Sequence, residues 1–201
     1  MQKSRIGILS SALVLAGICA LGTPHLAMAA KAPGISISPE SKIWVEGDST
    51  LHAFSFKSKN HNVEASGSGS GPRLDKLDVE IPVKGLKSGD GALDGNMYRA
   101  MEADKYPTIR FSLSNAKVKA AAGGDVDVDA TGTLTIAGTE KPITLKAEGS
   151  LDGKTFRLKG SKELMMSDYG VKPPVISLLI AKISVKDRIV VKYDLTGTLD
   201  D

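Results

Sequence analysis

Three aspartates, Asp125, Asp127 and Asp129, alternate along one segment as calcium ligands often do. A calcium loop of the EF-hand type also needs a glycine at its sharp turn and a closing glutamate, and this segment has neither in place. On a strand, alternation puts the three carboxylates on one face, away from the apolar side chains. The pattern therefore favours a solvated outer face that discourages edge pairing over a metal site.

The other residue types that could do chemistry are isolated from one another. His52 and His61 lie in no H-x-E or H-E-x-x-H spacing, so surface or turn positions are favoured over metal binding. Glu102 and Asp104 are two residues apart and would not face each other on a helix. The serines, Ser49 among them, lie in no nucleophile elbow. The sequence therefore predicts a protein that is not an enzyme and holds no metal.

The amino-terminal segment has the pattern of an export signal. Lys3 and Arg5 precede an apolar run, residues 6–21, and Ala27-Met28-Ala29 forms an A-x-A cleavage site. No charged stop-transfer flank follows, which makes a membrane anchor the weaker interpretation. We expect a signal peptide at residues 1–29, cleavage near Ala29, and a periplasmic or secreted protein with no stable membrane insertion.

Charge and cysteine content narrow the function classes further. Loss of Lys3 and Arg5 lowers the formal net charge from +3 to +1, since no acidic residue precedes Ala30. A nearly neutral chain gives no reason to expect a nucleic acid as partner. Cys19, the single cysteine, lies in the expected signal peptide. Thiol chemistry and disulfides are therefore excluded from the mature protein.

Only one segment predicts a helix. Met97 and Met101 share an apolar face, Asp94 stands where an N-cap would, and Pro107 is expected to end the helix. The alternating residues 109–113 then predict a strand that follows directly. A single short helix among strands suggests a barrel or sandwich with one end covered.

Most of the remaining chain alternates between apolar and polar residues. Residues 30–41 predict a flexible leader and residues 42–201 a single domain. Clear alternation over residues 77–84, 125–136 and 143–147, with short turns between, gives about eight strands. We expect an all-β fold with one short helix, an eight-stranded antiparallel up-and-down barrel.

Two segments leave alternatives open. Residues 63–71 are rich in glycine and serine and fit either an irregular edge strand or a loop. Residues 173–183 are apolar on both faces, which fits either a strand buried on both sides or an element that closes one barrel mouth.

Four motifs in order resemble the YceI family of exported, lipocalin-like barrels. They are Trp44-Val45-Glu46-Gly47-Asp48-Ser49, the set Asp94, Arg99, Tyr106, Pro107, Ile109 and Phe111, the run Gly132 to Gly138, and Asp187 to Leu195. The resemblance implies an eight-stranded barrel with an extended cavity that binds a polyisoprenoid or quinone-like chain. The chain departs from the family pattern at residues 57–61 and in the loop around Asp168 and Gly170.

Two functions follow from this resemblance and pattern. The first is a non-catalytic, periplasmic lipid-binding protein with an apolar ligand and no other cofactor. The expected lining residues are Trp44, Leu51, Val79, Ile81, Met97, Met101, Ile109, Phe111, Leu134, Ile136, Leu145 and Tyr193. The alternative is a structural or interaction module of the cell envelope with a filled barrel, because apolar alternation fits a packed core and a hollow one equally. An enzyme with an isoprenoid substrate is a weaker third option, and the oligomeric state stays open, a homodimer included.

Overall fold

The structure, a computed structural model, describes residues 34–67, 72–177 and 182–200. The expected signal peptide and the start of the expected leader lie outside the described residues. No helix within these three ranges is long and apolar enough to cross a membrane.

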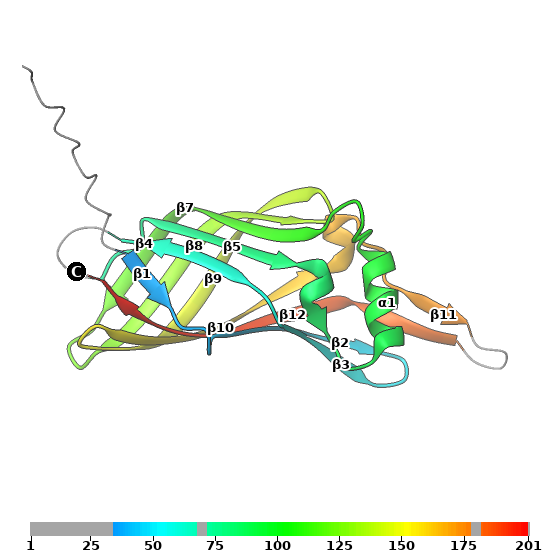
Figure 1. Ribbon diagram of the computed structural model, residues 1–201, viewed down its shortest axis with the longest axis horizontal. Coiled ribbons are helices and arrows are strands. Elements are labelled where there is room, and N and C mark those ends of the chain that lie inside the picture. Colours follow the sequence, from blue (N-terminus) through cyan, green and yellow to red (C-terminus); the bar gives the residue numbers. More distant parts are fainter. Residues whose placement is uncertain (1–33, 68–71, 178–181, 201) are drawn as a thin grey trace, which may run out of the picture. The chain divides into compact units, whose positions relative to one another are not determined.

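Eight antiparallel strands of the described residues close into a barrel (Figure 1). In ring order they are β1 (Gly34–Ile37), β4 (Asn62–Ser66), β5 (Lys76–Pro82), β7 (Thr108–Ala120), β8 (Asp125–Ile136), β9 (Thr139–Asp152), β10 (Thr155–Met165) and β12 (Lys182–Leu199). Pairing of β1 with β12 completes the ring. The predicted eight-stranded antiparallel barrel is confirmed.

Shorter elements extend the wall toward one end of the barrel. Strand β12 pairs with β1 near its end and with β2 (Lys42–Ser49) along its middle, and β3 (Ala53–Ser58) and β6 (Leu86–Lys87) continue outward from β2. The helix α1 (Gly91–Ala100) and two short 3-10 helices, η1 (Val83–Gly85) and η2 (Met166–Tyr169), occupy this same end, where β11 (Val175–Ser177) pairs with β12 (Figure 1). We call the end where β1 pairs with β12, which completes the ring of strands, the strand-closed end; the helices lie at the other end, the helical end.

The prediction of a flexible leader is wrong for residues 34–37, which form β1. Ile35 and Ile37 alternate with serine and point into the barrel, while the backbone pairs with β12 and with β4. The next residue continues this pairing, since the Ser38 amide donates to the Thr196 carbonyl at 2.7 Å. Two isoleucines at strand spacing outweigh the nearby proline and glycine, because burying them and pairing their backbone stabilises an ordered strand.

The helix begins and ends earlier than the sequence indicates. Asp90 is the N-cap, and its carboxylate accepts hydrogen bonds from the amides of residues 92 and 93 at 2.8 and 3.1 Å. Asp94 lies inside the first turn, only 6% exposed, and accepts bonds from the amide and hydroxyl of Ser88. The helix ends at Ala100, ahead of Glu102, whose φ is +48°, so Pro107 is not what ends it.

Strand pairing decides between the alternatives for the segments 63–71 and 173–183 as far as the structure describes them. Residues 62–66 form β4, a strand between β1 and β5, while residues 68–71 lie outside the described residues. In β11, Ile176 lines the interior, whereas Val175 is 52% exposed. A strand buried on both sides is therefore wrong for 175–177, because a short hairpin at the rim meets the interior on one face only. Residues 178–181 lie outside the described residues.

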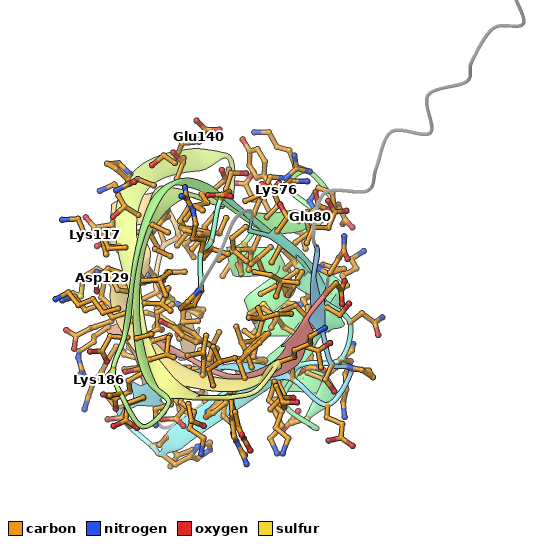
Figure 2. The ribbon with its side chains drawn as sticks, turned by 90° about the vertical axis from the view of Figure 1, so that its left-hand side faces the viewer. Lys76, Glu80, Lys117, Asp129, Glu140 and Lys186 are labelled. Carbon is orange, nitrogen blue, oxygen red and sulfur yellow. The ribbon has the colours of Figure 1, made fainter. Side chains whose placement is uncertain are left out.

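Charged side chains cover the outer face, as Figure 2 shows for Lys76, Glu80, Lys117, Asp129 and Glu140. The prediction that the alternating aspartates of β8 lie on this face is confirmed. Asp129 pairs with Lys146 at 3.7 Å and lies opposite Lys117 in the strand register. Opposite charges across neighbouring strands support the pairing modestly.

Candidate functional site: an apolar cavity along the barrel

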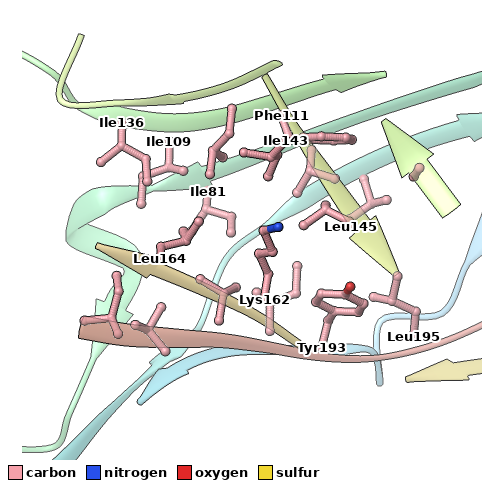
Figure 3. Close-up of a pocket in the computed structure, with 18 of the residues that line it drawn as sticks. Ile81, Ile109, Phe111, Ile136, Ile143, Leu145, Lys162, Leu164, Tyr193 and Leu195 are labelled. Atoms are coloured by element: carbon pink, nitrogen blue, oxygen red, sulfur yellow. The ribbon is translucent and has the colours of Figure 1, made fainter. Parts of the chain in front are cut away.

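The barrel encloses a cavity of about 310 Å³ that is lined almost wholly by aliphatic and aromatic side chains (Figure 3). Its walls come from every strand of the ring and from α1 and η2. Such a surface offers area burial with few polar contacts, which suits an apolar molecule.

The cavity is long relative to its volume. On β8 its lining runs from Val126 to Ile136, which corresponds to roughly 33 Å of strand at about 3.3 Å per residue. It also reaches Ile35 and Leu199 at the strand-closed end and Met97 at the helical end. A small volume spread along the barrel fits a thin chain better than a compact ring system.

The structure places ten of the twelve expected lining residues around the cavity. They are Val79, Ile81, Met97, Met101, Ile109, Phe111, Leu134, Ile136, Leu145 and Tyr193. Eight of these residues were predicted from strand alternation, and the two methionines were predicted from the apolar face of the helix region. Whether these residues contact a lipid stays a prediction.

Trp44 and Leu51 do not line the cavity, so these two assignments are wrong. On β2 it is Ile43 and Val45 that face inward, which turns Trp44 outward, where its indole N–H donates to Glu46 at 2.9 Å. Leu51 is 64% exposed in the turn after β2. Its amide donates to the Ser49 hydroxyl, so turn geometry and not strand alternation sets its direction.

Two aromatic rings of the cavity wall lie against glycines on neighbouring strands. A methyl group on Gly132 would stand 2.7 Å from the Phe111 ring, and one on Gly160 would stand 2.4 Å from the Tyr193 ring. The rings occupy the space that side chains at these glycines would fill. This arrangement keeps bulky groups on the wall and leaves the middle of the barrel open, a pairing that the sequence analysis missed.

Tyr193 also stabilises a point where two strands part. The paired residues of β9 and β10 end at Ala147 and Gly160. The Tyr193 hydroxyl lies over this point and donates to the Lys146 carbonyl at 2.7 Å. Burial raises the pKa of Tyr193 to about 12, which keeps the phenol protonated and able to donate.

The helix α1 is held over the barrel end by polar contacts on its outer side. The Tyr98 hydroxyl lies 3.0 Å from the carbonyls of both Lys84 and Leu86, and Lys87 donates to it at 2.6 Å. The Lys87 ammonium also lies 3.7 Å from the buried Asp94 carboxylate. These contacts anchor the helix so that Met97 and its neighbours face the cavity.

The polar residues considered for chemistry lie elsewhere. His61 borders a separate pocket that is more open than the barrel cavity, and burial lowers its pKa. Glu102 and Asp104 lie on the surface beside Lys105 and Lys84. No group of three metal-binding side chains occurs within the described ranges. Sequence reasoning did miss Lys162, which lies among the lining residues, although its inward position follows from the alternation of β10.

An antiparallel eight-stranded barrel with an apolar interior and one short helix defines the lipocalin-like class of fold. The model of the YceI-like domain family matches residues 38–197. The chain belongs to this family.

Curated relatives match only part of the chain. A UPF0312 protein of Pseudomonas putida strain F1 is 30% identical over 111 residues, which cover 51% of this chain and 56% of that protein. A UPF0312 protein of Pseudomonas aeruginosa is 30% identical over 128 residues, 60% of this chain and 59% of the relative. The chain thus matches a little over half the length of these relatives.

Solved structures share the fold at low identity. BcnA of Burkholderia cenocepacia is 21% identical with a TM-score of 0.63, covering 79% of this chain and 96% of BcnA. A polyisoprenoid binding domain from Saccharophagus degradans is 13% identical with a TM-score of 0.64, covering 83% and 99%. The Campylobacter jejuni YCEI protein is 20% identical with a TM-score of 0.55, covering 88% and 95%.

Proposed function

We propose that this protein is a non-catalytic carrier that holds a long apolar chain, of the polyisoprenoid or quinone-like kind, inside its barrel. The observation that carries the proposal is the narrow apolar cavity, which extends from the strand-closed end to α1. The name of the Saccharophagus degradans domain, which shares the fold, supports a polyisoprenoid as the class of ligand.

The ligand is retained through burial of its surface. Each buried methylene contributes about 0.8 kcal/mol, so a chain with many such groups binds tightly without specific polar contacts. The wall offers methionines at the helical end, Met97 and Met101, whose flexible side chains adapt to chains of different shape. We place the carrier in the periplasm, after removal of residues 1–29, because a lipid with such a chain needs shielding from water between membranes.

The proposal is tested on protein purified from the periplasm without detergent. Native mass spectrometry and organic extraction should reveal a bound isoprenoid. After delipidation, added farnesol should stabilise the fold by about 2.7 kcal/mol at a hundred times its Kd. A barrel that is empty on purification and gains no stability from farnesol or longer polyprenols would contradict the proposal.

The competing function is that of a structural or interaction module of the cell envelope, with a barrel filled by its own side chains. It requires large side chains that cross the interior, whereas here the rings of Phe111 and Tyr193 lie against glycines of the wall. The open cavity therefore favours the carrier.

A further inference from the structure

One lysine faces the interior of the barrel. Along β10 the inward positions are taken by Gly160, Lys162 and Leu164, while Ser161 and Glu163 between them are exposed. Figure 3 shows the Lys162 side chain extending from β10 into the space bounded by Ile81, Leu145, Leu164 and Tyr193. An ammonium group thus lies in a cavity whose lining is otherwise apolar except for Arg73 and Asn96.

Within the described residues, Lys162 has no acidic partner. The residues that line the cavity include no aspartate or glutamate. The adjacent Glu163 points outward and pairs with Arg188 at 2.5 Å, and the nearby Tyr193 hydroxyl is bonded to the Lys146 carbonyl. Other lysines of the barrel, such as Lys159 on the same strand, pair with carboxylates on the outer face.

An unpaired ammonium in this place discriminates between ligands. Lys162 is half-buried, so solvent can reach its ammonium group when no ligand is bound. A fully apolar ligand would displace that water and leave the charge unpaired, which is costly. A ligand with an anionic group would replace the water by a charge-assisted hydrogen bond, which is among the stronger polar contacts in proteins.

We propose that Lys162 binds the anionic head group, a phosphate or a carboxylate, of an amphiphilic lipid whose chain fills the cavity. This inference rests on the proposed function and specifies its ligand class. It places the head group inside the barrel. From Lys162 the apolar wall of β10 continues to Phe156 and Leu158, roughly 20 Å of strand, along which the chain lies.

The experiment compares three probes that share one chain, namely farnesyl phosphate, farnesoic acid and farnesol. Affinities are measured by calorimetry on delipidated wild type, on Lys162→Met, and on Lys159→Met as the matched outward control from the same strand. Loss of the charge-assisted bond should weaken both anionic probes roughly tenfold to a hundredfold in Lys162→Met. Farnesol should bind this variant as well as or better than it binds wild type, and Lys159→Met should behave like wild type.

Further variants and probes distinguish a failure of the proposed role of Lys162 from a failure of the carrier function. Lys162→Arg should recover most of the affinity for farnesyl phosphate, and circular dichroism checks that Lys162→Met is folded. Equal weakening of farnesol and the anionic probes, or no weakening of either, would overturn the role of Lys162 and leave the carrier function standing. Binding of inorganic phosphate as tight as farnesyl phosphate would show an anion site without a lipid. If none of the three probes binds wild type, the carrier function itself fails.

Discussion

Replacement of Ala147 by phenylalanine distinguishes a hollow barrel from a filled one by the sign of the stability change. Ala147 lies on β9, is half-buried and lines the cavity. It faces Val128 on one neighbouring strand and Gly160 on the other. A phenyl ring on this residue would therefore extend into the interior.

The size of the expected change in the free energy of unfolding follows from the burial of the added phenyl ring. Full burial of a phenylalanine side chain is worth about 1.5–3 kcal/mol, of which the alanine methyl already supplies roughly 0.8 kcal/mol. A hollow barrel should thus gain about 1–2 kcal/mol in its free energy of unfolding. In a packed core the same ring has no room, and overpacking costs about 1–3 kcal/mol.

Urea unfolding of delipidated protein measures this difference, with Glu148→Phe as the control. Glu148 is the next residue on β9 and is exposed, so the control carries the same aromatic strand preference without entering the cavity. It should change stability by no more than about 0.5 kcal/mol. Ala147→Phe should also abolish farnesol binding. A loss of more than about 1 kcal/mol in Ala147→Phe alone, with an unchanged m-value, would refute the hollow interior.

Three further predictions concern single side chains. Tyr193→Phe should cost about 0.5–1.5 kcal/mol in urea unfolding, because the part-buried hydrogen bond to the Lys146 carbonyl is lost. Phe111→Ala should cost less than the roughly 3–5 kcal/mol typical of packed cores, because the space it vacates joins an existing cavity, and a full cost would argue against that cavity. Burial alone would raise the pKa of Asp94, but the bonds from Ser88 and the nearby ammonium outweigh it and hold this pKa below its usual range. A depressed folded-state pKa gives stability that is present above about pH 4 and is lost as pH falls through the folded value, so Asp94→Asn should flatten the acid limb of a stability-against-pH curve.

Strand alternation predicted the barrel and most of its lining because a period of two assigns every residue to one face. It predicted Ile109 and Phe111 correctly from their own strand. The assignment of Trp44 was wrong, because Ile43 and Val45 on either side of it face inward and alternation then turns Trp44 outward. The predicted lining also left out Lys162, although this residue stands two residues before Leu164 on β10 and alternation puts both on the inner face.

Helix boundaries and the state of the interior needed information that lies beyond local pattern. Asp90 and Asp94 are both suitable N-caps, and only the contact with Ser88 shows that Asp94 serves inside the first turn. Filled and hollow barrels have the same alternation. The difference depends on pairs from separate strands, such as Phe111 with Gly132, that come together only when the register is set.

A hollow interior also changes where this fold obtains its stability. The barrel forgoes much of the burial that a packed core supplies, and the outer ion pairs, such as Arg110 with Glu80 at 2.6 Å, are exposed and each contribute about 1 kcal/mol at most. The backbone hydrogen bonds of the closed ring therefore contribute a large part of the stability. The proposed chain in the cavity would add burial that the protein alone lacks. If the proposed chain binds there, ligand and fold would stabilise each other, and the free energy of unfolding would report on which chain, and which head group at Lys162, the barrel accepts.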